Sequence, residues 1–221
     1  MKKIVLKLYE FDELSKDSQE RIIERERWNV MEQCMSAYNV DYEASMKAFG
    51  ELTNAKVYDY EVGYSTCNFS YGFKHSDIFT ENLCGKLLFR YINNNIMPHI
   101  TKGKYYSIGK YIDGKYNYKC RRSRVILGYE DNCPLTGSCY DYYLLKPIIN
   151  YYDTWCTYPG DFSFEDLIGR CYDSFFKSWH EEYEYWADNE DAIREELHHN
   201  QYEDRLYYEN GDVYVCPLYT V

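Results

Sequence analysis

The chain has 221 residues, with 36 acidic and 25 basic side chains and a formal net charge of −11. Its 28 tyrosines and 4 tryptophans supply enough large side chains for a packed core, which argues against a disordered chain. No window approaches the roughly 18 uncharged apolar residues of a membrane span, and Lys7 interrupts the only early apolar run, at Ile4–Leu6. We therefore expect a cytoplasmic protein.

Charge is distributed unevenly along the chain. Residues 101–124 hold eight basic side chains and one acid, a local net of +7, whereas residues 161–221 hold sixteen acids and four bases, a net of −12. Such segregation indicates which partners a surface attracts, and it says nothing about catalysis.

The nine cysteines predict no disulfide framework. Their number is odd, no pair has the CxxC spacing, and only Cys133 and Cys139 approach the close spacing of a zinc site. We expect mostly buried, reduced thiols and no bound metal or cofactor.

The first third of the chain predicts one strand and two helices. Apolar residues alternate over Lys3–Phe11, which is typical of a strand. Ser15 is a plausible N-cap for a helix that runs to about Val40. A second helix is expected over Asp41–Thr53.

The middle of the chain predicts antiparallel strands around one helix. The period-two pattern of Lys56–Phe73 changes face near Tyr64–Thr66, which predicts a bulge or turn there. Ser76 begins a helix that ends at the Asn93–Asn95 run. Asp113-Gly114 is the strongest hairpin signal in the chain, and it lies between two expected strands, Tyr105–Ile112 and Lys115–Arg121.

The last third is expected to be mainly helical. Val125–Tyr129 is a further candidate strand, and Thr136–Tyr152 a helix that Pro147 kinks or restarts. Phe162–Asn200 predicts a broken helix. Asn210-Gly211 predicts a closing hairpin between the segments Arg205–Tyr208 and Val213–Cys216. Helices mixed with hairpins give an α+β class, as a single domain over residues 1–221 with an acidic helical region at 161–221.

No catalytic motif is present. His180-Glu181-Glu182 resembles the opening of HExxH, but position 184 is Glu, and the phosphate-loop, dinucleotide and nucleophile-elbow motifs are absent. We assign no catalytic residue and expect a non-enzyme. A metal-dependent nuclease or an unrecognised Cys–His pair stays open as the alternative.

Clustered carboxylates form the first candidate site. Acids on a helix can be a solvated face, a protein-binding patch or, when several elements converge, a magnesium site. Spaced carboxylates can also imitate the phosphates of nucleic acid and occupy a basic groove on a nucleic-acid-binding protein. The candidate partner-binding residues are Glu181, Glu182, Glu184, Asp188, Glu190, Asp191, Glu195 and Glu196.

The basic hairpin is the second candidate site. Tyrosines interleave with its cations, as in strands that stack bases. It can bind RNA or single strands, dock a protein, or only protect a sheet edge, and the overall negative charge opposes nucleic acid. Its candidate residues are Lys102, Lys104, Tyr105, Lys110, Lys115, Lys119, Arg121, Arg122 and Arg124.

Three segments carry a resemblance to a protein family. They are Tyr9–Ser15 followed by a charged helix with Trp28, then Leu135-Thr136-Gly137 through Ile148, and the acidic stretch that starts at Glu182. Together they resemble an uncharacterised "FDELS"-type family encoded by bacteriophages and other mobile elements, although Arg205-Leu206 departs from the family's acidic ending. The resemblance implies a phage or mobile-element origin and action in the host cytoplasm.

These expectations combine into one leading hypothesis. Small acidic phage proteins without enzyme motifs are often inhibitors of host defence, including anti-CRISPR proteins. We therefore expect a non-enzymatic inhibitor that binds a host defence nuclease through an acidic, nucleic-acid-mimicking surface. The alternatives are an RNA- or single-strand-binding regulator that uses the hairpin, and an antitoxin-like protein. Self-association through the opposed charge blocks is also possible.

Overall fold

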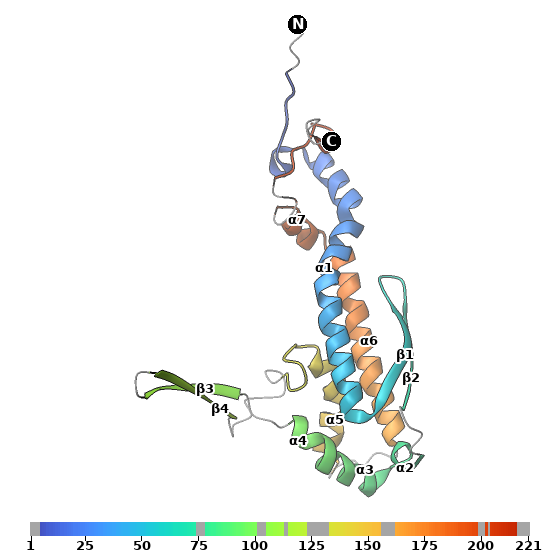
Figure 1. Cartoon of the computed structure of the whole chain (residues 1–221). Coiled ribbons are helices and arrows are strands. Elements are labelled where there is room, and N and C mark those ends of the chain that lie inside the picture. The colour runs from blue at the N-terminus through green and yellow to red at the C-terminus, as the bar shows by residue number, and fades with distance from the viewer. Residues whose placement is uncertain are drawn as a thin grey trace. The chain divides into compact units, whose positions relative to one another are not determined.

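The computed structural model describes residues 5–73, 78–100, 105–112, 115–122, 133–155, 162–198, 202 and 204–215 (Figure 1). Its helices and antiparallel strand pairs confirm the α+β class. The chain divides into two compact units, and each is described by itself below. Unit 1 combines residues 1–37 with 181–221, and unit 2 is residues 38–180. That the whole chain acts as one domain stays a prediction.

Unit 1 is built around the first part of α1 (Lys16–Thr53), the end of α6 (Phe164–Asp188) and α7 (Glu190–His198). The short 3-10 turn Phe11–Glu13 and the segment 204–215 complete it. These elements share one apolar cluster, whose buried members are Phe11, Leu14, Ile22, Ile23, Val30, Ile193, Leu197, Tyr202 and Tyr207.

The strand expected at the N-terminus is wrong over its described part. Residues 5–8 belong to no strand, and Tyr9 makes a single antiparallel bridge with Tyr207 through two backbone hydrogen bonds of 2.9 Å. The chain then turns at once, because the Phe11 side chain enters the apolar cluster. The expected strand at 205–208 is likewise reduced to bridges, but the Asn210-Gly211 turn is confirmed, with Gly211 at φ 88°.

The expected break between two helices near Val40 is also wrong. α1 is one continuous helix of 38 residues that begins after Ser15, whose Oγ accepts a hydrogen bond from the Ser18 N–H at 3.3 Å. Next to the expected break, the Asn39 side-chain oxygen accepts a hydrogen bond from the Trp179 indole N–H at 2.8 Å, which joins α1 to α6.

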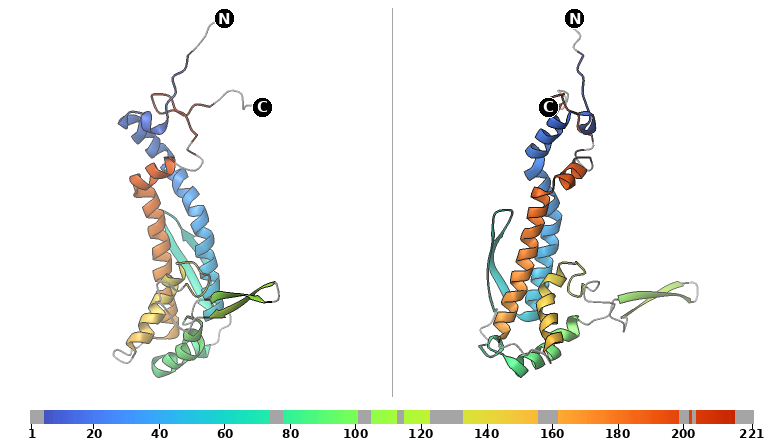
Figure 2. Two further views of the ribbon diagram at one scale, coloured as in Figure 1. Left: turned by 90° about the vertical axis from the view of Figure 1, so that its left-hand side faces the viewer. Right: turned by 180° about the vertical axis from the view of Figure 1, so that it is seen from behind.

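In unit 2, α1 and α6 run antiparallel and pack through aromatic side chains (Figure 2). The Tyr42 and Trp179 rings stack with their centroids 4.8 Å apart. About two turns further along α1, the Phe49 and Tyr172 rings meet edge to face with their centroids 5.5 Å apart. The hairpin of β1 (Ala55–Val62) and β2 (Cys67–Phe73) lies beside α6. Its Phe69 stacks on Phe176 at 4.3 Å, so aromatic side chains connect the hairpin to α6.

The turn expected near Tyr64–Thr66 is confirmed. The Gly63 N–H donates to the Thr66 carbonyl at 2.9 Å and closes the β1–β2 hairpin. An additional bulge lies between Val57 and Asp59, which the sequence pattern did not predict.

The helix expected to run from Ser76, which lies outside the described residues, to Asn93–Asn95 is interrupted. α2 (Ile78–Glu81) and α3 (Gly85–Tyr91) are separated by Cys84, which is extended and bridges Ser163. The Phe164 N–H donates to the Leu83 carbonyl at 2.8 Å, so this bridge replaces a helical turn. The asparagine run continues as the π-helical segment Ile92–Ile96, followed by α4 (Met97–Ile100), and therefore does not end the helix.

The remaining elements follow the sequence expectations more closely. β3 (Tyr105–Ile112) and β4 (Lys115–Arg122) pair antiparallel, with Ile112 opposite Lys115, as the hairpin signal predicts. α5 (Asp141–Thr154) continues through Pro147 and starts five residues later than expected. The broken helix expected over Phe162–Asn200 is confirmed as α6 and α7, and the structure places the break at Asn189. The candidate strand at Val125–Tyr129 lies outside the described residues.

The late start of α5 has a clear cause. The buried Asp141 carboxylate accepts hydrogen bonds from the backbone of Leu135 and Thr136, at 2.9 and 2.8 Å, and from the Thr136 hydroxyl at 2.9 Å. These bonds hold residues 135–140 in a turn, which competes with a helical start at Thr136.

Candidate functional site

All eight predicted carboxylates lie in unit 1, on the last turns of α6 and on α7. Glu182 and Glu196 are half-buried, and the other six are exposed: Glu181, Glu184, Asp188, Glu190, Asp191 and Glu195. We call these six residues the acidic face. The eight carboxylates were expected on one helical stretch, but they lie on two helices, α6 and α7.

The end of α6 presents a stripe of three carboxylates. Glu181, Glu184 and Asp188 follow a spacing of three and four residues, which keeps them on one side of the helix. With a rise of 1.5 Å per residue they span about 10 Å, whereas three phosphates of one DNA strand span about 7 Å. The charge density of the stripe is therefore about two thirds of that of one nucleic-acid strand.

α7 holds its share of the acidic face through a cap and an apolar anchor. The Asn189 side-chain oxygen accepts a hydrogen bond from the Ala192 N–H at 3.1 Å, as an N-cap residue does. Ile193 and Leu197 are buried in the apolar cluster, which leaves Asp191 and Glu195 exposed one turn apart.

Arg27 joins α1 to the acidic face within unit 1. Its guanidinium donates a hydrogen bond to the Ala187 carbonyl, near the end of α6. It also lies 2.9 Å from a Glu24 oxygen and 3.5 Å from a Glu190 oxygen. Arg27 therefore fixes the break between the two helices and neutralises part of the charge of Glu190. Arg27 was not among the residues predicted from the sequence. Its i,i+3 spacing from Glu24 is the one sequence feature that indicates an ion pair.

A buried carboxylate ties the C-terminal segment to α1. Glu26 accepts hydrogen bonds from Arg25 at 3.1 Å, from Arg205 at 3.5 Å and from the Asn29 amide at 3.2 Å. Its side chain is only 9% exposed, so the two cations and the amide replace the water that it loses. Arg205, which departs from the family pattern, thus has a structural partner.

Glu182 differs from the six exposed acids in its burial. Burial of its side chain raises the pKa of the carboxyl above its ordinary value, because a low-dielectric environment disfavours the charged form.

The formal net charge of the protein belongs entirely to unit 1. Residues 1–37 and 181–221 carry twenty acids and nine bases, a net of −11, whereas residues 38–180 carry sixteen of each and sum to zero. The acidic face therefore belongs to a unit in which acids outnumber bases. The negative potential of its carboxylates is not cancelled by the cations of that unit.

The Tyr9–Ser15 segment has a structural role in unit 1. Phe11 and Leu14 are buried, and Asp12 lies 3.1 Å from the His198 ring nitrogen at the end of α7. The Gln19 side-chain amide donates to the Phe11 carbonyl at 3.1 Å and to the Leu14 carbonyl at 3.3 Å. The Tyr9–Ser15 segment therefore contacts the end of α7 and the apolar cluster of unit 1.

The basic hairpin is described only in its backbone. Lys110, Lys115, Lys119 and Arg121 occupy ladder positions of one parity, and Tyr105, Tyr111, Tyr116, Tyr118 and Arg122 occupy the other. Tyrosines and lysines are interleaved in the sequence, but most of the tyrosines and the lysines occupy positions of opposite parity in the ladder. Lys102, Lys104 and Arg124 lie outside the described residues.

The described residues contain neither a metal-ligand cluster nor a membrane-spanning helix. Within the ranges given above, no three His, Cys, Asp or Glu side chains are placed to hold a metal ion. None of the helices in those ranges has the length and apolar character needed to cross a membrane. Six cysteines in the described part of the chain are free thiols, and Cys171 alone among these six is buried, so the expectation of mostly buried thiols is wrong for them.

Comparison with known proteins gives no relative. No protein-family model, no curated protein and no solved structure matches the chain.

Proposed function

We propose that the protein is a non-enzymatic inhibitor that binds a basic, nucleic-acid-binding groove on a host defence nuclease, such as a CRISPR effector. The observation that supports the proposal most is the concentration of the whole −11 charge on unit 1, with six exposed carboxylates on two consecutive helices. The resemblance to phage and mobile-element proteins supplies the class of partner and the host cytoplasm as the place of action.

The physical basis of binding is electrostatic competition. A groove that holds nucleic acid is lined with Lys and Arg, and a carboxylate stripe can occupy it in place of phosphates. Charges of this kind mainly accelerate association and set specificity, so the association rate should fall as salt increases. The same physics applies to an antitoxin that neutralises a basic toxin, which is the competing interpretation.

The test measures inhibition of DNA cleavage by a panel of purified CRISPR effector complexes, together with the dissociation constant from 50 to 500 mM salt. The variant replaces Glu181, Glu184 and Asp188 with Lys. The matched control replaces Glu51, Asp59 and Glu61 with Lys, which are exposed acids of unit 2 and change the net charge equally. We expect the first variant to lose binding to the inhibited effector at least tenfold, and the control to keep it.

Two outcomes would contradict the proposal. One is the absence of binding and inhibition across the panel at low salt. The other is an affinity that is indifferent both to salt and to the charge reversal on α6.

A further inference from the structure

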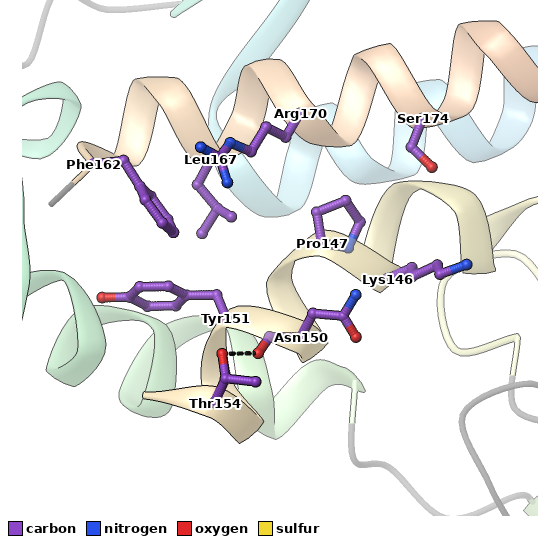
Figure 3. A pocket seen from close by; sticks show the side chains of 9 residues that line it. All are labelled: Lys146, Pro147, Asn150, Tyr151, Thr154, Phe162, Leu167, Arg170 and Ser174. Atoms are coloured by element: carbon purple, nitrogen blue, oxygen red, sulfur yellow. Dashed lines mark hydrogen bonds between the residues drawn. The ribbon is translucent and has the colours of Figure 1, made fainter. Parts of the chain in front are cut away.

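A second candidate site lies in unit 2, away from any residue used above. α5 and α6 enclose a pocket of about 390 Å³ (Figure 3). This volume lies in the range of sites that hold small organic ligands. Its lining residues are Lys146, Pro147, Asn150, Tyr151, Thr154, Phe162, Leu167, Arg170 and Ser174.

The middle of the pocket is apolar and well fixed. Pro147 and Leu167 face each other from the two helices, and the Tyr151 and Phe162 rings lie 5.1 Å apart. The Tyr151 hydroxyl donates a hydrogen bond to the Gly85 carbonyl at 3.3 Å, which orients its ring. Burial raises the pKa of this phenol to about 12, so it stays neutral at physiological pH.

Arg170 brings a cation to the aromatic end of the pocket. Its guanidinium carbon lies 4.5 Å from the centre of the Phe162 ring. Stacking of this kind uses the flat face of the guanidinium and leaves its N–H groups available for an anion. Asp166, one turn earlier on α6, accepts hydrogen bonds from the Ser163 N–H and hydroxyl, both at 2.8 Å, and these bonds together with the nearby charge of Arg170 lower the pKa of its carboxyl.

The other end of the pocket is also rich in donors. Lys146 lies over the Tyr142 ring at 5.5 Å, and Figure 3 shows Ser174 on α6 above Pro147 and Asn150 on α5 below it. Among the residues that the structure describes, no carboxylate lies within 4.0 Å of Lys146 or Arg170. The lining contains two cations and no acid, although the protein as a whole is strongly acidic.

We propose that this pocket binds a small organic anion, namely a phosphate or carboxylate group on an apolar or ring-containing body of about the size of a nucleoside monophosphate. Arg170 would hold the charged group at the aromatic end, because charge-assisted hydrogen bonds to such anions are the strongest that side chains make, and Lys146 would contact the opposite end of the ligand. Asn150 and Ser174 supply neutral polar contacts, and Pro147, Leu167 and Tyr151 cover the body. The chemistry resides in residues that are 24 positions apart in the sequence, so no motif reveals it.

The test is isothermal titration of the full-length protein with adenosine 5′-monophosphate, benzoate, adenosine and inorganic phosphate. We expect the nucleotide or benzoate to bind with a dissociation constant below about 1 mM. The uncharged nucleoside and the bare phosphate should bind at least tenfold more weakly, because each lacks one half of the recognised ligand. Comparison of the nucleotide with benzoate distinguishes phosphate from carboxylate recognition.

Variants assign the binding to the pocket. Arg170→Met and, separately, Lys146→Met should each weaken binding at least tenfold, whereas Arg90→Met, an exposed arginine on α3, should not. Arg170→Lys keeps the charge but loses the planar guanidinium group. It serves as the second test variant if Arg170→Met does not fold. No binding by the nucleotide or benzoate at 10 mM would overturn the proposal. Equal binding by Arg170→Met and Arg90→Met, or by inorganic phosphate and the nucleotide, would overturn it as well.

Discussion

Glu26 shows how much a single side chain contributes in an acidic unit. It is buried, yet its neighbours are cations from both α1 and the C-terminal segment. We predict that Glu26→Gln lowers the free energy of unfolding by about 1 to 3 kcal/mol, because it removes charge-assisted hydrogen bonds and leaves Arg205 less well paired. Urea denaturation measures this, with Glu20→Gln, an exposed position on the same helix, as the control. Equal losses in the two variants would contradict the role of the network.

Glu182 predicts the opposite effect on stability. Its folded-state pKa is raised by burial, so its protonated form favours folding. This contribution is present below the ordinary glutamate pKa and is lost as the pH rises through the raised value. We therefore expect Glu182→Gln to raise the thermal midpoint at pH 7 and to have no effect at pH 3.5. A variant that is less stable than the parent at pH 7 would contradict this.

At the scale of the element, the break between α6 and α7 determines where the acidic face points. Asn189 caps α7, and its replacement removes a hydrogen bond to the Ala192 N–H. Asn189→Ala should cost about 1 kcal/mol of stability. Thermal unfolding measures the change. Asn29 lies inside α1 and caps no helix, but its side chain contacts Glu26, so Asn29→Ser is unsuitable as a control. Asn68→Ala, an exposed position on β2, is the better control.

The closing turn of the chain depends on a glycine. Gly211 has φ 88°, and an added Cβ would lie 3.2 Å from the Ser18 carbonyl oxygen. Gly211→Ala should therefore lower the free energy of unfolding by about 1 to 2 kcal/mol or more. Gly63→Ala, where a Cβ meets only Thr66 Oγ1 at 3.8 Å, should change it less. A smaller effect at Gly211 than at Gly63 would contradict this account.

Local signals in the sequence predicted the elements that depend on local chemistry. Asp113-Gly114, the Ser15 cap and the Asn210-Gly211 turn all indicated features that the structure contains. The errors occurred where a distant segment decides the local structure. Cys84 is extended because it pairs with Ser163, and Tyr9 has no strand beyond its bridge to Tyr207.

The candidate site shows the same division. The charge count identified the carboxylates of α6 and α7, because surface charge is largely visible in composition. It did not reveal that Arg27 binds the Ala187 carbonyl or that Glu26 pairs with Arg205, because these partners are more than 150 residues away in the sequence. Nor did it reveal the cationic pocket, because Lys146 and Arg170 lie on different helices.

At the scale of the whole molecule, the central feature is that one unit carries the full net charge while the other sums to zero. A docking surface of this kind predicts association that depends strongly on ionic strength, since screening shortens the reach of exposed charges to about 10 Å at 0.1 M salt. A purely solvated surface predicts no partner at any salt concentration.

The most direct test of this account is the dependence of the association rate on salt for the effector complex that the protein inhibits. We predict a rate that falls at least tenfold between 50 and 500 mM salt, and a loss of most of this dependence when Glu181, Glu184 and Asp188 are replaced with Lys. A rate that is unchanged by salt, or a variant with the same salt dependence as the parent, would contradict the acidic face as the docking surface.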